Sequence, residues 1–109
     1  MKQTVPNYEV WIAERWNGQQ PAQKPRGEVP YPPVAAMGLA GEVGEVMELL
    51  KKHWRDGTHP GVNLLLECGD VLHYLTVILH SYGFTLGEAM GANVTKLEDR
   101  DAKRGYVVP

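Results

Sequence analysis

The stretch LLLECGDVLHYLTVIL, residues 64–79, decides the fold of this chain. On a helix its leucine, valine and isoleucine residues lie on nearly every side, and a helix that is apolar all round must be buried all round. A single chain of 109 residues can hardly enclose such a helix, so we expect self-association into a homodimer or a homotetramer. Glu67, Asp70 and His73 interrupt the apolar run, which indicates a buried helix and not a membrane span.

Three further helices are expected around this stretch. Asn7 can cap a first helix through Trp16, and residues 17–33, with five of the eight prolines, form a long loop. The second helix starts near Pro33 and ends before Gly57. The third helix starts with Pro60 in its first turn and runs to about Tyr82, before a glycine. The fourth helix starts at the capping box Thr85-Leu-Gly-Glu88 and ends within residues 102–105. The sequence therefore predicts an all-α, four-helix domain over residues 1–109, which self-association completes.

Composition narrows the class of protein. The chain is 43% hydrophobic and 22% charged with a net charge of −2, so nothing marks it as a binder of nucleic-acid polymers or membrane surfaces. Its single cysteine, Cys68, excludes an intrachain disulfide framework and fits a reducing compartment. The first ten residues contain no continuous apolar run, so we expect no signal peptide and a cytoplasmic location.

Two pairs of carboxylates, Glu42-Val-Gly-Glu45 and Glu67-Cys-Gly-Asp70, lie within otherwise apolar segments. Their i,i+3 spacing places both members of a pair on one helix face. Four converging carboxylates repel one another unless a cation lies among them, and oxygen ligands suit a hard cation such as Mg²⁺ or Mn²⁺. The pattern predicts a metal site across two helices, with Glu42, Glu45, Glu67 and Asp70 as ligands.

The alternative is a set of structural ion pairs with three cations at the end of the second helix: Lys51, Lys52 and Arg55. Leucine and valine residues surround Glu67 and Asp70 in the sequence, so we expect buried surroundings there. Strongly perturbed, buried carboxylates tend to mark functional sites, and we therefore favour the metal site over ion pairs.

Three glycines, Gly38, Gly41 and Gly44, share the helix face of Glu42. Each costs about 0.5–1 kcal/mol relative to alanine within a helix. We expect a close approach to the backbone on this face, either by a neighbouring helix or by a ligand.

The fourth helix carries a polar stripe of Asn93, Lys96 and Arg100 with i, i+3, i+7 spacing. Such a stripe is commonly a solvated face, but opposite a metal cluster it forms the cationic, hydrogen-bonding half of a phosphate site. Tyr74 lies one turn after Asp70 on the same face, where its hydroxyl bonds either a ligand or a group in the core.

Aromatic residues supply candidates for stacking on a flat base. Trp11, Trp16 and Trp54 are all suitable, although tryptophan is first a core residue; we select Trp11 and Trp54 as substrate contacts.

His73 follows Asp70 by three residues, as in the E-x-x-H motif of di-iron bundles. Those bundles need the motif twice, and the second helix offers no matching histidine. We therefore assign His73 to the core or to an interface.

Three motifs in this order resemble the MazG-like nucleotide pyrophosphohydrolases: GLAGEVGE (38–45), ECGDVLHY (67–74) and ANVTKLEDR (92–100). The resemblance covers about residues 35–105. It implies an all-α enzyme in which Glu42, Glu45, Glu67 and Asp70 bind Mg²⁺ and Asn93 and Lys96 contact the nucleotide, with Tyr74 and Arg100 as further contacts. It also implies hydrolysis of a nucleoside triphosphate, such as a deoxynucleotide, to the monophosphate and pyrophosphate, with Lys96 stabilising charge on the phosphates and nucleotide-pool cleaning as the default role.

The chain departs from the family pattern at one position. Many members carry a further glutamate immediately before the first pair, and here that residue is Gly41; Glu48, one turn after Glu45, is a candidate to compensate. Two other functions remain open: a phosphoribosyl-ATP pyrophosphohydrolase, which shares a similar E-x-x-D helix, and a non-catalytic helical interaction module. The Ala-Asn-x-x-Lys stretch favours the MazG-like function.

Overall fold

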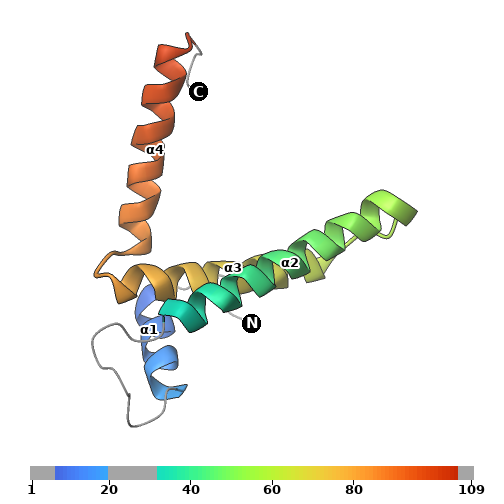
Figure 1. Cartoon of the computed structure of the whole chain (residues 1–109), viewed down its shortest axis with the longest axis horizontal. Coiled ribbons are helices and arrows are strands. Elements are labelled where there is room, and N and C mark those ends of the chain that lie inside the picture. Colours follow the sequence, from blue (N-terminus) through green and yellow to red (C-terminus); the bar gives the residue numbers. More distant parts are fainter. Residues whose placement is uncertain (1–6, 20–31, 106–109) are drawn as a thin grey trace.

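Four helices make up the described part of the chain, and no strand occurs within it. The computed structural model describes residues 7–19 and 32–105. The helices are α1 (Tyr8–Gln19), α2 (Pro32–Asp56), α3 (Val62–Ser81) and α4 (Leu86–Lys103) (Figure 1). The all-α prediction is confirmed. The helix α1 runs three residues beyond the predicted end at Trp16, and residues 20–31 of the predicted loop lie outside the described residues.

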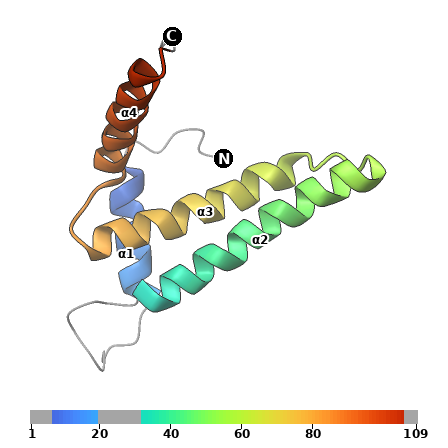
Figure 2. The ribbon, with the colours of Figure 1, turned by 45° about the horizontal axis from the view of Figure 1, so that its top comes forward.

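The helices α2 and α3 form an antiparallel hairpin that dominates the molecule (Figure 2). Gly57 and Gly61 bound the connection with φ values of 79° and 61°, a left-handed conformation that glycine adopts without strain. Gly61 is also the N-cap of α3, so this helix begins two residues after the predicted start at Pro60. The hairpin brings the two acidic pairs, one on each helix, to the same level.

A small core joins α1 to one end of this hairpin. Its buried hydrophobic members are Ile12, Ala35 and Val77, one from each of three helices. Gly38 on α2 allows Tyr74 of α3 to pack closely, because a Cβ atom at Gly38 would lie 2.5 Å from the Tyr74 ring. Of the two predicted causes for the glycine face, a neighbouring helix explains Gly38; Gly41 and Gly44 face open space in the described chain.

The fourth helix turns away from the other three (Figures 1 and 2). It starts with the predicted capping box, in which Thr85 accepts from the Glu88 amide and the Glu88 carboxylate accepts from the Thr85 amide. The chain reaches it through Gly83, with φ of 80°. No residue of α4 is buried, so its apolar side has no neighbour within the described chain.

The helix α3 is not enclosed within one chain, contrary to the burial expected on all its sides. Only Thr76 and Val77 are buried, whereas Leu65 is 71% exposed and Leu66 is 57% exposed. By length and composition alone, α3 is the one helix of the described residues that could cross a membrane, with 11% of that window buried. Length and composition are weak grounds, and Glu67 and Asp70 lie in the middle of this helix.

Candidate metal and nucleotide site

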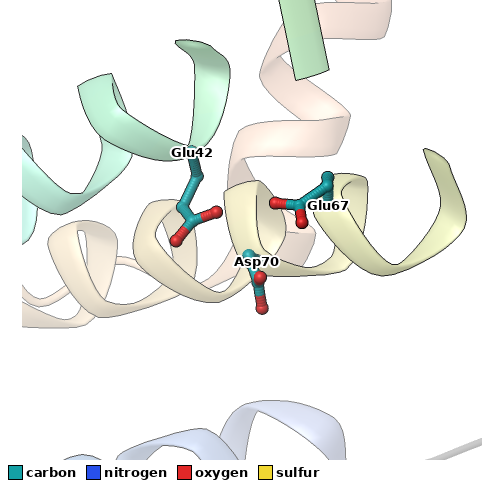
Figure 3. A group of neighbouring side chains, drawn as sticks. All are labelled: Glu42, Glu67 and Asp70. Carbon is teal, nitrogen blue, oxygen red and sulfur yellow. The ribbon is translucent and has the colours of Figure 1, made fainter. Parts of the chain in front are cut away.

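Three of the four predicted ligands converge between α2 and α3. Oxygen atoms of Glu42, Glu67 and Asp70 all lie within 4.8 Å of one another. Glu42 descends from α2, and Glu67 and Asp70 come from successive turns of α3 (Figure 3). The i,i+3 spacing of the second pair places Glu67 and Asp70 one turn apart, so that an oxygen of each comes close to Glu42 although the Asp70 side chain points away from α2 (Figure 3).

The donor set of this cluster fits a hard divalent cation. Oxygen ligands of one Mg²⁺ at about 2.1 Å lie about 3.0 Å apart when adjacent and about 4.2 Å apart when opposite. The oxygens of the cluster lie within 4.8 Å of one another. Small side-chain rotations would bring them to the separation of Mg²⁺ ligands. All three donors are carboxylate oxygens, the ligand type that Mg²⁺ and Mn²⁺ prefer.

Electrostatics in the cluster also favour a cation. The pKa of Glu42 is raised by burial, by its hydrogen bond with the Glu67 carboxyl group, and by the negative charges of Asp70, Glu67 and Glu45. A raised pKa means that the folded chain disfavours the ionised form of Glu42. A divalent cation among these oxygens would remove the cost, since it would replace mutual repulsion with attraction.

Ion pairs do not account for the cluster. Within the described residues, none of the five ion pairs involves Glu42, Glu45, Glu67 or Asp70. The nearby cations bind elsewhere: Lys51 pairs with Glu48 at 3.5 Å and Arg55 with Asp56 at 3.3 Å. The Glu48 carboxylate is thus engaged away from the cluster.

Glu45 differs from the three carboxylates whose oxygens meet. Glu45 is exposed on α2 and is not among the oxygens that meet, although its charge acts on Glu42. Its role as a ligand stays a prediction.

The expectation of buried surroundings for Glu67 and Asp70 is wrong for the single chain, because Asp70 is exposed and Glu67 is only partly covered. Helix periodicity predicts which face residues share, but not whether a neighbour covers that face.

A pocket of about 450 Å³ opens beside the cluster, between α1 and α3. Glu42 and Asp70 form part of its wall, so the pocket is continuous with the carboxylate cluster. The α1 side contributes two indole rings and a guanidinium group, those of Trp11, Trp16 and Arg15. The volume is within the usual range for small-molecule sites, and aromatic walls with a few polar groups are typical of them.

The α3 wall of the pocket holds Tyr74 and His73. The two rings lie edge to face with centroids 4.9 Å apart, and Trp16 meets His73 in the same way at 6.3 Å. Burial and the positive charge of Arg15 lower the pKa of His73, against an opposing effect of Asp70. The lowered pKa disfavours the charged ring, which agrees with the assignment of His73 to the core, and the same ring also lines the pocket.

The stripe on α4 lies apart from this pocket within one chain. Asn93, Lys96 and Arg100 are all exposed, and none lines the pocket. Trp54, 89% exposed near the end of α2, does not line it either. Of the predicted substrate contacts, the described chain therefore brings only Trp11 and Tyr74 to the carboxylates.

The comparison with protein families agrees with this arrangement. The MazG nucleotide pyrophosphohydrolase domain matches residues 34–105, well over half of the chain. The chain belongs to this family. The matched segment contains all four predicted metal ligands and the whole α4 stripe.

Membership of the MazG family fixes the general character of the protein. The family consists of all-α nucleotide pyrophosphohydrolases that generally depend on a divalent metal, and the resemblance stated from the three motifs is confirmed. No curated protein and no solved structure matches the chain significantly. The particular site must therefore be built from this chain's own residues.

Two pocket residues, Tyr8 and Arg15, were missed in the sequence. Burial and the charge of Asp70 raise the pKa of Tyr8, and Arg15 is the lysine or arginine residue among those that line this pocket. The pocket-lining residues of α1 have i, i+3, i+4, i+7, i+8 spacing: Tyr8, Trp11, Ile12, Arg15 and Trp16. That spacing marks one helix face, so the signal was present in the sequence. The matched family segment begins after α1, so the motifs gave no reason to look there.

Proposed function

We propose that this MazG-family chain is a Mg²⁺-dependent nucleotide pyrophosphohydrolase that converts a nucleoside triphosphate, such as a deoxynucleotide, to the monophosphate and pyrophosphate. One observation carries the proposal: the three-carboxylate cluster and an aromatic-lined pocket share Glu42 and Asp70 as a common wall. A phosphate chain that is held at the cluster thus leaves its base beside the indole rings.

Water is the nucleophile in the proposed reaction. Its oxygen attacks the α-phosphorus, the bond from that phosphorus to the bridging oxygen breaks, and pyrophosphate leaves with that oxygen. Glu42, Glu67 and Asp70, with Glu45 as a further ligand, would hold Mg²⁺, which would supply charge neutralisation and a lowered pKa of bound water. The carboxylates would orient the reacting phosphate through the cation that they hold, since they repel it directly. The family's extra glutamate is absent because residue 41 is glycine.

The remaining residues bind and orient the nucleotide. Trp11 is half exposed at the pocket and offers a face on which a base stacks. Tyr74 lies in the same wall, and its hydroxyl hydrogen-bonds the sugar or the phosphate. Lys96, with Asn93 and Arg100, stabilises the charge that develops on the phosphates. Trp54 is a more distant candidate for substrate contact.

The proposal includes the setting of the enzyme. Large hydrophobic side chains on α2, α3 and α4 are exposed in the single chain, which supports a homodimer or homotetramer. We place the enzyme in the cytoplasm, with nucleotide-pool cleaning as its role and Mn²⁺ as a substitute for Mg²⁺. Nucleic-acid polymers and membranes are not partners in this proposal.

The test is Mg²⁺-dependent pyrophosphate release from a panel of standard and modified nucleoside triphosphates, with phosphoribosyl-ATP included. Turnover of one or more triphosphates that EDTA abolishes supports the proposal. Turnover of phosphoribosyl-ATP alone would assign the chain to that reaction. Folded protein that turns over no member of the panel would contradict the proposal and favour a non-catalytic interaction module.

A further inference from the structure

The α1 wall of the pocket carries a guanidinium group that makes no ion pair in the described chain. Arg15 lines the pocket, and within residues 7–19 and 32–105 it takes part in none of the ion pairs and in none of the side-chain hydrogen bonds. Its side chain is exposed, so a ligand can reach it without displacing a protein partner. The guanidinium group therefore faces whatever occupies the pocket with its donors unused.

The pocket face of α1 has Tyr8 near one end and Arg15 near the other. Seven residues separate the two, which is roughly 10 Å along a helix axis. Burial and then the charge of Asp70 raise the pKa of Tyr8, whereas burial and then the charge of Arg15 lower the pKa of His73, against a smaller effect of Asp70. Within the described residues no ion pair joins Arg15 to Glu42 or Asp70. Arg15 thus lies away from the carboxylate end of the pocket.

The proposed function places the base of the nucleotide, and not its phosphates, beside Arg15. Phosphates that are oriented by a cation at Glu42 and Asp70 occupy the carboxylate end, and the base then extends along α1. Trp11 and Arg15 both line the pocket and are i,i+4 neighbours on α1. A base that stacks on the half-exposed Trp11 ring therefore has one edge within reach of the guanidinium group.

Arg15 differs from the neighbouring polar groups because it only donates hydrogen bonds. The hydroxyls of Tyr8 and Tyr74 and the uncharged His73 ring each donate and accept, so they fit any base. The planar guanidinium fork donates to two adjacent acceptor atoms. Guanine presents such a pair in O6 and N7, and cytosine presents one in O2 and N3.

Adenine and thymine do not offer this pair of acceptors. Adenine places the N6 amino donor beside N7, and in thymine an N–H donor separates O2 from O4. A donor that faces the fork would leave two donors opposed and one of them without a partner, which costs free energy once water is excluded. The chemistry of Arg15 therefore separates the four common bases into two classes.

We infer that Arg15 is a specificity-determining residue whose guanidinium group hydrogen-bonds two adjacent acceptor atoms of the base, so that the site prefers guanine and cytosine nucleotides to adenine and thymine nucleotides. The inference rests on the proposed function, because it assigns the base of that same substrate to the pocket. Family membership does not supply it, since α1 ends at Gln19 and the matched segment starts at residue 34.

The base preference is measured as kcat/KM for dGTP, dCTP, dATP and dTTP with Mg²⁺. A bidentate arginine contact discriminates between bases by roughly 5- to 150-fold, and we expect about tenfold because the Arg15 side chain is exposed. An advantage of dGTP that disappears with 7-deaza-dGTP, in which a C–H group replaces N7, shows that the fork binds O6 and N7; an advantage of dCTP shows that it binds O2 and N3. Equal kcat/KM values for all four nucleotides would overturn the inference.

Substitution of Arg15 tests whether this residue sets the preference. Arg15→Leu should make the four kcat/KM values nearly equal, and Arg15→Gln should raise the ratio of dATP to dGTP hydrolysis at least tenfold, because a glutamine amide fits N6 and N7 of adenine. The matched control is Arg104→Gln, the same substitution at an exposed arginine at the end of α4 and outside the pocket, which should keep the wild-type preference. A fall in kcat/KM by the same factor for all four nucleotides in Arg15→Gln would place Arg15 on the phosphates and overturn the inference.

Binding of the nucleoside monophosphates separates base recognition from hydrolysis. Quenching of tryptophan fluorescence reports occupancy, because Trp11 lines the pocket. Wild type should bind dGMP or dCMP about tenfold more tightly than dAMP and dTMP, and Arg15→Leu should lose this difference; equal affinities in wild type would overturn the inference.

The two measurements distinguish failure of the inference from failure of the proposed function. A chain that hydrolyses triphosphates without base preference refutes the role of Arg15 and leaves the activity intact. A chain that shows the Arg15-dependent difference in binding but releases no pyrophosphate refutes the activity and leaves the base contact intact.

Discussion

The helices α1 and α4 both lie next to α3, but α1 packs against it in the core whereas α4 turns away from it. The helix α1 contributes Trp11 and Arg15 to a pocket beside the carboxylates of its own chain. The helix α4 carries Lys96 and Asn93 on an exposed surface outside that pocket. One described chain therefore brings α1 to the carboxylate cluster but leaves the α4 stripe away from it.

The carboxylate cluster gives the largest expected effect and tests the part of the site that one chain supplies. Glu67→Gln or Asp70→Asn should lower kcat/KM by about three orders of magnitude, because the metal accounts for several kcal/mol of transition-state stabilisation. In EDTA the same variants should melt at a higher temperature than wild type, since one of the repelling carboxylates is gone.

Thermal unfolding with Mg²⁺ and with EDTA measures these changes in Tm, and Glu98→Gln on α4 is the matched control. The wild-type chain and the control should melt at a higher temperature with Mg²⁺, and the cluster variants should not. An equal Mg²⁺-induced rise in Tm for Glu67→Gln and wild type would show that the ion binds elsewhere.

The two tryptophans sharpen the contrast between the pocket and the exposed surfaces. Trp11→Ala should raise KM roughly 5- to 150-fold, because stacking of an aromatic side chain on a base contributes about 1–3 kcal/mol. Trp54→Ala, at a position 89% exposed and outside the pocket, should raise KM by a smaller factor. Steady-state kinetics measures both KM values. A larger rise in KM for Trp54→Ala than for Trp11→Ala would place the base near the end of α2 and not in the pocket.

A pair of glycine substitutions compares a closed face of α2 with an open one. Gly38→Ala forces the Tyr74 ring to move and should destabilise the fold by about 1–3 kcal/mol. Gly44→Ala meets nothing within 4 Å and should stabilise it by about 0.5–1 kcal/mol. Chemical denaturation of both variants checks this difference. Destabilisation by Gly44→Ala would contradict the open space around this position.

The smallest expected effect concerns Glu9, which ties α1 to the start of α4. The hydrogen bond from the Leu86 amide, and then that from the His80 side chain, lower the pKa of Glu9 below its ordinary value of 4.5. A lowered pKa in the folded state contributes stability that is present above pH 4.5 and is lost as the pH falls through the folded value. The contribution is modest, because the Glu9 side chain is 30% exposed.

Acid unfolding of Glu9→Gln measures this contribution. The variant should be slightly less stable than wild type at neutral pH and should lose less stability as the pH falls below 4.5, so that the two curves converge. Parallel curves over the acid range would show that the Glu9 carboxylate does not hold the junction.

Local chemistry made the elements and most of the cluster predictable from the sequence. The capping box at Thr85 and Glu88 and the positive φ of Gly83 depend on neighbouring residues alone. The spacing of Glu67 and Asp70 places them on one face whatever packs against it. These features follow from helix geometry, so the sequence contains them in full.

Tertiary packing decided what the sequence did not reveal. The direction of α4 depends on contacts of Glu9 with Leu86 and His80, which lie more than 70 residues away in the chain. The exposure of Leu65 depends on which surfaces meet, and a helix that is apolar all round does not say whether its own chain or another one covers it. The pocket required α1 to cross α3 at the level of Asp70, which no motif encodes.

The central claim, cleavage between the α- and β-phosphates at the carboxylate cluster, is tested most directly by product analysis in water enriched in heavy oxygen. With Mg²⁺ and a nucleoside triphosphate that the panel identifies, we expect monophosphate and pyrophosphate in equal amounts, with the heavy oxygen in the monophosphate. Diphosphate with inorganic phosphate as the products, or heavy oxygen in the pyrophosphate, would contradict the account.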